Sequence, residues 1–465
     1  KSHFDHNKIK SWDDVADHCR EAQDYCIADV VALEGVFTGY NNLTLSKFKI
    51  PIYERLTIAS FAYAVFKSML PETTMLTITK KEDYEVSRKC LFGGRVAAQL
   101  PSFSSEDIDM AMFKDYSISN TDYARITDYL IQFDVVSQYP YVMREFRYPT
   151  GKLKTITDKG LLGEILKKCN ESPEVFDNDF FYRSIWEVDI QPPDDILVPY
   201  LFSRVDGKLA QDLLLKEKAV YTGVDILEAL AVGYVITKIH IIHEFEYLEN
   251  IFEKYIDVCF KGKKNSPKDS AEYWVYKILM NGLSGKFSQK MIEDSFTILV
   301  TDKIIKDEGY SADTEWVQAL KENNVALGAL VKYKKNSKDV EPFYSTHISA
   351  FITSHARAYM SRVLREIGGY KDPKYTFFYT DTDSYVMHSR VLKRMAPFIG
   401  GELGKFEDEL KGKIVEAVFV GKKTYALTYL LPTPSDHSVR MKIRCKGIPH
   451  TSASLKMEDL DFEEE

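Results

Sequence analysis

The pattern of apolar and polar positions predicts strands around two segments that contain aspartates. In the apolar run YLIQFDVVSQYPYVM (129–143), Asp134 is the only charged residue. The pieces YTFFYT and SYVM of residues 375–387 are rich in aromatic and β-branched residues typical of strands, and Asp-Thr-Asp-Ser between them is typical of a turn. We therefore expect a strand ending near Asp134 and a hairpin with Asp381 and Asp383 at its tip.

Helical spacing of apolar positions predicts two helices. Residues 348–369 have apolar side chains at helical intervals, and Gly368-Gly369 supplies a stop. A second helix is expected to begin near Ser266 and Pro267, with Ser266 as its cap, and to run through AEYWVYKILMNGLSG. The basic tract KGKKNSPKDS (261–270) is predicted to be a loop.

Composition indicates an ordinary globular protein, because 45% of the 465 residues are hydrophobic and 28% are charged. A net charge of −8 argues against binding of nucleic acid by overall charge alone. Local basic segments remain. Residues 261–290 contain seven lysines against two acids, and residues 421–447 contain six lysines and arginines against one acid.

Six cysteines are scattered without a C-x-x-C pair, which predicts a reducing intracellular compartment such as cytoplasm, mitochondrion or virion. The most apolar window, residues 229–237, is too short to cross a bilayer, so no membrane association is expected.

A carboxylate inside a strand needs a partner, because burying an unpaired charge costs several kcal/mol. Asp134 at a strand end, beside an aspartate on a hairpin tip, could hold two Mg²⁺ ions for phosphoryl or nucleotidyl transfer. For the hairpin alone, ordinary turn chemistry explains the aspartates as well.

A third group lies in KILMNGLSGKF (277–287), where Lys277, Asn281 and Gly285 share one helical face. A lysine there can bind triphosphate oxygens. An exposed helical lysine is also commonplace, so this group alone is a weak signal.

The order D-x-x-S-x-Y-P, K-x-x-x-N-G-x-x-G and Y-x-D-T-D-S resembles motifs A, B and C of the family B (α-like) DNA polymerases, and especially of their protein-primed branch. Three further elements are similar: CLFGGRV (90–96), GKKTYAL (421–427) and RCKGIP (444–449). The resemblance covers about residues 20 to 450. It implies an α+β, right-hand polymerase with an antiparallel-sheet palm, helical fingers, a short thumb and two insertions.

The resemblance implies a role for each matching residue. The catalytic carboxylates are Asp134, Asp381 and Asp383, and two Mg²⁺ ions, which Mn²⁺ can replace, are held by Asp134, Val135 through its carbonyl, and Asp383. The incoming dNTP is bound by Ser137, Tyr139 as the steric gate against a 2′-OH, Lys277 and Asn281. The primer and template are contacted by Lys423, Tyr425, Lys446, Gly93 and Gly94.

Motif B departs from the family pattern N-S-x-Y-G, because Gly282 and Ser284 stand where the family has Ser and Tyr. Since that Tyr lines the pocket for the new base pair, altered nucleotide affinity or fidelity is expected.

The spacing and the resemblance together predict the domain organisation. Residues 143–258 are expected to hold a terminal-protein-binding insertion, and residues 291–345 a second insertion with the basic tip KYKKNSK (332–338). The whole assignment is an exonuclease remnant (1–45), linker and first palm part (46–142), first insertion (143–258), fingers (259–290), second insertion (291–345), palm (346–430) and thumb start with acidic tail (431–465).

Tyr25 and Asp29 match a Y-x-x-x-D motif of the family's 3′–5′ exonuclease, with no other exonuclease motif upstream. We therefore expect a longer natural protein or a loss of proofreading. The expected function is protein-primed, DNA-directed DNA synthesis with DNA, dNTPs and a terminal protein as partners. The alternative is a polymerase fold retired from catalysis and kept as a structural or nucleic-acid-binding subunit.

Overall fold

The computed structural model describes residues 19–55, 57–76, 80–108, 117–171, 177–205, 207–289, 294–300, 315–322, 325–335, 345–432 and 437–447. The chain divides into two compact units. Unit 1 comprises Lys1–Glu72 and Phe252–Lys286, and unit 2 comprises Thr73–Ile251 and Phe287–Glu465. Each is described by itself.

Unit 2 contains a ten-stranded sheet in which every pair of neighbouring strands is antiparallel. The strand order is β1-β14-β15-β4-β17-β18-β19-β3, with β16 paired to β4 and β2 to β17. Its strands are β1 (Val96–Ala98), β2 (Ser102–Ser104), β3 (Ser117–Ile118), β4 (Leu130–Val135), β14 (Tyr379–Asp381), β15 (Ser384–His388), β16 (Phe406–Asp408), β17 (Lys413–Gly421), β18 (Thr424–Leu430) and β19 (His437–Arg444). The predicted strand before Asp134 and the predicted hairpin are confirmed as β4 and β14–β15.

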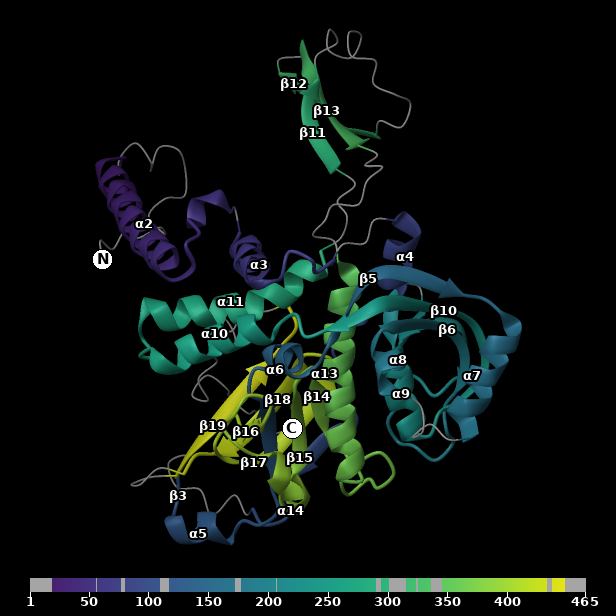
Figure 1. Cartoon of the computed structure of the whole chain (residues 1–465). Coiled ribbons are helices and arrows are strands. Elements are labelled where there is room, and N and C mark those ends of the chain that lie inside the picture. Colours follow the sequence, from purple (N-terminus) through teal and green to yellow (C-terminus); the bar gives the residue numbers. More distant parts are fainter. Residues whose placement is uncertain are drawn as a thin grey trace. The chain divides into compact units, whose positions relative to one another are not determined.

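The predicted helix at 348–369 is confirmed as α13 (Thr346–Glu366), which runs beside the sheet in Figure 1. Gly368 follows it with a φ of 88°, a conformation that glycine adopts without steric cost. One core joins α13 to the strands on both of its sides, because Met360 clusters with Tyr385 of β15 and Trp186 of β6. Motif A continues from β4 into the short helix α6 (Gln138–Glu145).

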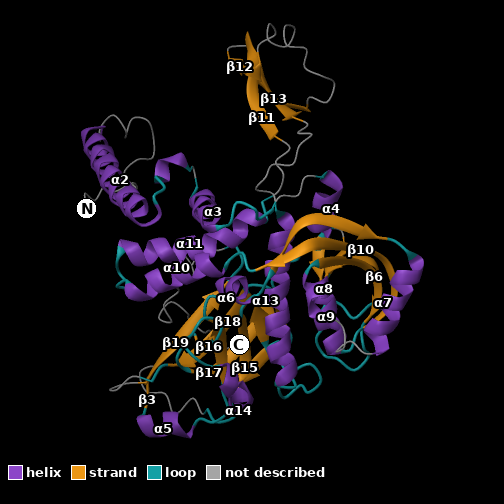
Figure 2. Ribbon diagram, in the orientation of Figure 1, coloured by secondary structure: helices purple, strands orange, loops and turns teal. Residues whose placement is uncertain are grey.

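A second sheet of unit 2 has the antiparallel order β5-β10-β6-β9 (Figure 2). It lies within residues 143–258, where the first insertion was predicted. Its strands and helices are β5 (Tyr148–Ile156), β6 (Ser184–Gln191), β9 (Lys216–Thr222), β10 (Val235–Glu249), α7 (Lys159–Glu171), α8 (Asn178–Tyr182) and α9 (Gly223–Val232). A small hairpin, β7 (Ser203–Val205) and β8 (Lys208–Ala210), accompanies them.

Unit 1 is helical, with α2 (Cys19–Phe48), η2 (Ile52–Glu54), α3 (Ile58–Met69), α10 (Glu253–Asn265) and α11 (Ala271–Phe287). Aromatic residues hold α3 against the start of α10, since the Phe66 ring stacks on Phe252 at 4.9 Å and meets Tyr255 at 5.8 Å. The sequence pattern had assigned α3 to the linker and palm segment.

The predicted start of the second helix and the predicted loop at 261–270 are wrong in detail. Residues 261–265 are the last turn of α10, and Ser266 follows its end. Pro267 lies in a turn closed by the Ser270 N–H donating to the Pro267 carbonyl at 2.9 Å. The helix α11 begins only at Ala271, where the Ser270 hydroxyl accepts from the Tyr273 N–H at 3.1 Å. The Ser270 side chain is therefore the cap that the pattern assigned to Ser266.

Other elements of the described chain are α4 (Lys81–Lys89), α5 (Asn120–Arg125), η5 (Ser389–Val391), α14 (Leu392–Met395) and η6 (Ala396–Phe398). A third antiparallel sheet, β11 (Asp294–Val300), β13 (Val325–Lys335) and β12 (Glu315–Glu322), lies in the predicted second insertion. The end of its basic tip, residues 336–338, and the acidic tail lie outside the described residues. The predicted thumb segment starts with β19, which pairs with β18.

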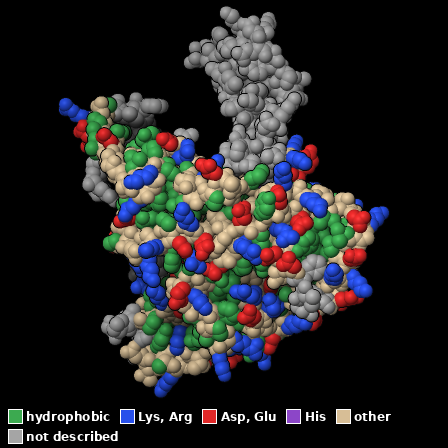
Figure 3. All heavy atoms as spheres, viewed as in Figure 1, with side chains coloured by type: hydrophobic (Ala, Val, Ile, Leu, Met, Phe, Trp, Pro, Cys, Tyr) green, Lys and Arg blue, Asp and Glu red, His purple; other side chains and the backbone are tan. Residues whose placement is uncertain are grey.

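Acidic and basic side chains are interspersed over the face seen in Figure 3. The net charge of −8 is therefore not gathered into a single acidic patch on this face.

Candidate active site

Strand pairing brings Asp134 and Asp383 together from positions far apart in the sequence. The strands β15 and β4 are neighbours, with Ser384 directly opposite Asp134. The Val135 N–H donates to the Asp383 carbonyl at 2.9 Å, which ties the end of β4 to the hairpin tip. The three residues predicted to hold metal thus lie together where β4 ends and β15 begins.

Both carboxylates are in an environment that disfavours their charge. Burial, and then the neighbouring Asp383, raises the pKa of Asp134 to about 7. Burial, helped by the nearby Asp381 and Glu409, raises the pKa of Asp383 to about 6. A bound cation would relieve this repulsion and return both groups to their ionised form.

The donor set fits a hard divalent cation. The described residues contain no group of three or more His, Cys, Asp or Glu side chains arranged to hold a metal. The candidate ligands are instead a pair of carboxylates and a main-chain carbonyl. Mg²⁺ suits such a set, because it is usually bound by one or two carboxylates together with water and substrate oxygens.

Two further acids near the site, Glu407 and Glu409, were not identified from the sequence. Glu407 of β16 lies directly opposite Asp134, and both glutamates raise the pKa of Asp134. Lys442 of β19 lowers that pKa and donates to Glu409 at 3.1 Å and to Gln132 at 3.0 Å. In the sequence, the two glutamates belong to the short acidic run FEDE (406–409), which is too common a pattern to indicate a site.

Asp381 has a different environment from Asp383. The Lys423 ammonium donates to both Asp381 oxygens, at 2.6 and 2.9 Å. The Lys423 N–H also donates to the Tyr379 hydroxyl at 2.9 Å, in a turn where Lys423 has a φ of 60°. Asp381 therefore has a cation partner inside the protein, which agrees with a supporting role for it.

The turn after β4 is strained. Ser137 has a φ of 52°, in the left-handed region that non-glycine residues rarely occupy, and α6 begins directly after it. The next residue but one, Tyr139, is partly buried. Burial raises the pKa of its hydroxyl, Asp383 and Asp381 raise it further, and Arg357 lowers it. Tyr139 therefore lies within electrostatic reach of the hairpin tip.

Gly93 and Gly94, which we call the Gly-Gly segment, support the hairpin tip. A Cβ on Gly94 would lie 2.5 Å from the Thr382 Cγ2, so only glycine fits there. The Arg95 carbonyl accepts from the Thr382 N–H at 2.6 Å. The predicted contacts of Gly93 and Gly94 with DNA stay a prediction, but Gly94 has a packing role that the sequence did not show.

Tyr425 lies within β18, and Lys446 comes two residues after the end of the neighbouring strand β19. The Tyr425 ring is 5.0 Å from Tyr379, and burial raises the pKa of its hydroxyl to about 12. The Lys446 side chain is exposed, and its N–H donates to the Thr424 hydroxyl at 3.5 Å.

The predicted nucleotide-binding residues of motif B lie on α11 in unit 1. The Lys277 ammonium is 4.6 Å from the centre of the Trp274 ring, a cation–π contact. Asn281 and Gly285 are exposed, as expected of residues on a common face. Ser284 donates to the Asn281 carbonyl at 3.4 Å.

Tyr25 and Asp29 lie one turn apart on α2, where a hydrogen bond to Asp29 is the largest cause that raises the pKa of Tyr25. All six cysteines are free thiols. Within the described part of the chain, every helix is too short or too polar to traverse a bilayer.

Relatives with similar sequences are named as DNA polymerases. A "DNA polymerase" of Kluyveromyces lactis is 26% identical over 451 residues, covering 92% of this chain and 39% of the relative. A "Probable DNA polymerase" of Neurospora intermedia is 26% identical over 379 residues, 78% of this chain and 33% of the relative. The "DNA-directed DNA polymerase" of Enterobacteria phage PRD1 is 25% identical over 449 residues, 96% and 64% respectively. The chain thus spans only 33% of the Neurospora intermedia relative and 39% of the Kluyveromyces lactis relative.

A solved structure has the same fold. Phi29 DNA polymerase complexed with primer-template DNA superposes with a TM-score of 0.59 at 18% identity, over 88% of this chain and 62% of the other. The predicted α+β class is therefore confirmed. The profile of the family described as "DNA polymerase type B, organellar and viral" matches residues 3–113 and 118–367. This match covers more than half of the sequence, and the chain belongs to the organellar and viral type B DNA polymerases.

Proposed function

We propose that the chain provides the active site of a DNA-directed DNA polymerase, which transfers dNMP to a primer 3′-OH under the direction of a template. The observation that carries this proposal is the pairing of β4 with β15, which brings the partly buried carboxylates of Asp134 and Asp383 together. Family membership and the polymerase fold support it.

Asp134, Asp383 and the Val135 carbonyl would hold two Mg²⁺ ions. When bound, such ions lower the pKa of an attacking hydroxyl and neutralise the charge of the leaving pyrophosphate. The protein's own part is to present the two carboxylates at the ends of neighbouring strands. The Lys423 ammonium is hydrogen-bonded to Asp381, so it leaves the Asp383 oxygens available to a metal ion.

Nucleotide and primer would be positioned by further residues of both units. In unit 2, the partly buried Tyr139 ring would exclude a ribose 2′-OH, and Ser137 would bind triphosphate oxygens. In unit 1, Lys277 would bind triphosphate oxygens, with Asn281 behind it on α11. Lys423, Tyr425 and Lys446 would contact the primer terminus and the backbone. The relative Phi29 DNA polymerase binds primer-template DNA and incoming nucleotide, which supports these partners.

We further propose priming by a terminal protein. The support is the four-stranded sheet β5-β10-β6-β9, which the chain forms between motifs A and B in addition to the ten-stranded sheet. The free thiols support a reducing compartment. A retired polymerase fold is disfavoured, because the carboxylates, Tyr139 and Lys423 are all retained around one site.

Primer extension with Mg²⁺ tests the polymerase proposal. The protein is expected to extend a labelled primer on a DNA template, and Asp383→Asn is expected to lose this activity almost completely. Lack of extension by the unsubstituted protein, or equal extension by both, would refute the proposal. Transfer of a labelled dNMP to a protein hydroxyl tests the priming mode separately.

A further inference from the structure

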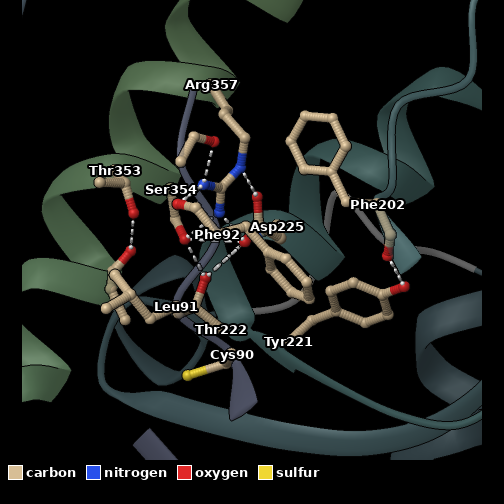
Figure 4. Close-up of polar contacts among 12 residues, drawn as sticks. Cys90, Leu91, Phe92, Phe202, Tyr221, Thr222, Asp225, Thr353, Ser354 and Arg357 are labelled. Carbon is tan, nitrogen blue, oxygen red and sulfur yellow. Dashed lines mark hydrogen bonds and ion pairs between the residues drawn. The ribbon is translucent and has the colours of Figure 1, made fainter. Parts of the chain in front are cut away.

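Arg357 of α13 is a buried arginine that the sequence did not single out, and Figure 4 shows its contacts. Its side chain is 4% exposed, and Nε and Nη2 donate to the two Asp225 oxygens at 3.2 and 2.6 Å. Nη1 donates to the carbonyls of Phe92 at 2.5 Å and Gly93 at 3.1 Å. One guanidinium thus joins α9, α13 and the Gly-Gly segment.

Asp225 is fixed in turn by several donors. Its oxygens accept from Ser354 at 2.7 Å, Tyr200 at 3.0 Å and Thr222 at 3.2 Å, besides Arg357. The ion pair is therefore fully hydrogen-bonded, which is the condition under which a buried pair is held in one geometry. Asp225 belongs to the insertion that lies between motifs A and B.

The Gly-Gly segment carries this anchoring to the hairpin tip. The residue after Gly93 packs directly against Thr382, and the Arg95 carbonyl accepts the Thr382 N–H. Beyond them, β1 pairs with β14, with Val96 opposite Asp381. The carbonyls held by Arg357 are thus linked to the turn between Asp381 and Asp383 through two residues of backbone, Gly94 and Arg95, and their non-covalent contacts with Thr382.

We propose that Arg357 is a positioning residue for the metal-binding turn: by holding the Phe92 and Gly93 carbonyls against Asp225, it fixes the Gly-Gly segment that supports Thr382 and thereby places Asp383. This inference rests on the proposed function for its catalytic meaning. A lysine cannot replace the arginine, because an ammonium lacks the planar fork that reaches a carboxylate and two carbonyls at once.

Arg365 offers a matched control on the same two helices. It lies eight residues later on α13 and donates to Glu228 of α9 at 3.4 Å. Within the described part of the chain, it makes no hydrogen bond to Phe92, Gly93 or Gly94. Arg357→Lys and Arg365→Lys therefore make the same chemical change in two α13–α9 ion pairs. Only Arg357→Lys disturbs the path to Thr382.

Amide hydrogen exchange of residues 379–388 measures the turn without any need for catalysis. We expect Arg357→Lys to speed exchange in this peptide by about tenfold and Arg365→Lys to leave it unchanged. In parallel, Mg²⁺ titrations of primer extension should show a half-saturating concentration about 10- to 100-fold higher for Arg357→Lys, as for other residues that support metal ligands. Equal exchange in the two variants would overturn the positioning role.

Gly94→Ala decides the question if Arg357→Lys does not fold. It leaves the α9–α13 contacts in place and forces Thr382 to move. We expect faster exchange and a higher Mg²⁺ requirement, and no change in either would overturn the route through the Gly-Gly segment. Altered exchange in a protein that extends no primer would refute the proposed polymerase activity while supporting the physical coupling.

Discussion

The pair formed by Asp134 and Asp383 is the clearest feature at the scale of single residues, because burial and then the charge of nearby carboxylates raise the pKa of both groups. A carboxylate whose pKa rises on folding destabilises the fold once the pH exceeds its unfolded pKa. At neutral pH the active site therefore costs stability, as is common where function sets the local electrostatics.

Removing one of these charges should stabilise the protein when metal is absent. We expect Asp134→Asn to raise stability in EDTA by about 1–2 kcal/mol, after discounting for partial exposure, and to raise Tm by a few degrees. Mg²⁺ should raise the Tm of the unsubstituted protein and have a much smaller effect on the variant. Thermal melts with and without Mg²⁺ check this, and a variant less stable than its parent in EDTA would contradict it.

Tyr139 should control discrimination between ribo- and deoxyribonucleotides. Tyr139→Val is expected to reduce the preference for dNTP over rNTP by at least about 10²-fold, because the steric exclusion of the 2′-OH is lost. The measurement is kcat/KM for matched nucleotides in single-turnover extension. Tyr141→Phe is a suitable control, since Tyr141 packs on Tyr359 at 5.0 Å, and an unchanged preference in Tyr139→Val would rule out the steric gate.

Lys423 should matter for activity and hardly for stability. In its ion pair with Asp381, the Lys423 side chain is 55% exposed. Exposed ion pairs contribute less than about 1 kcal/mol to the free energy of unfolding. We expect Lys423→Ala to lower the extension rate by about 10²-fold, through loss of a donor near developing charge, with an unfolding midpoint close to that of the parent. A parallel loss of stability would point to a structural role instead.

At the scale of elements, α13 was predictable and its polar interior was not. The apolar spacing and the stop at Gly368-Gly369 predicted the helix. The side chains of His347 and His355, which belong to the same helix, are also buried. Burial lowers the pKa of each to about 3, and among the residues that the structure describes the Nε2 of His355 has no hydrogen-bond partner. Helical periodicity cannot reveal this, because polar residues at core positions look like interruptions of the pattern.

These two histidines predict loss of stability in acid. Each must stay neutral in the folded protein, so its contribution is complete above pH 6.5 and falls as the pH drops from 6.5 towards 3, by about 1.4 kcal/mol per pH unit. His355→Phe should flatten this dependence and keep the ring stack on Phe146 at 4.1 Å. Denaturant midpoints between pH 5 and 7.5 test it, with His240→Gln as a control at a paired histidine; equal slopes for parent and His355→Phe would contradict it.

At the scale of the whole molecule, the proposed binding of DNA by a chain of net charge −8 would depend on local basic segments. The exposed Lys446 lies at the end of such a segment. We expect Lys446→Ala to weaken primer-template binding and to reduce the slope of log K against log salt by about 1. Lys371→Ala is the control, because Lys371 pairs with Asp195 at 2.6 Å, and an unchanged slope for Lys446→Ala would remove Lys446 from the interface.

The sequence by itself determined the strand before Asp134, the aspartate hairpin, α13 and the family. These features depend on local periodicity and on short motifs whose order along the chain carries information. The start of α11 could not be predicted, because Ser266 and Ser270 are both acceptable caps, and the pattern did not show that α10 extends to Asn265 and uses Ser266 as its own C-cap.

Only the tertiary structure decided which side chains share a site. Several contacts join residues that are distant in sequence. Glu407 and Glu409 lie near Asp134, Lys423 pairs with Asp381, and Gly94 packs against Thr382. Arg357 is the strongest example, since an arginine in an amphipathic helix has no local signal of burial. Strand register and helix packing bring these groups together. Both depend on how two segments pair, so the pattern of a single segment does not predict them.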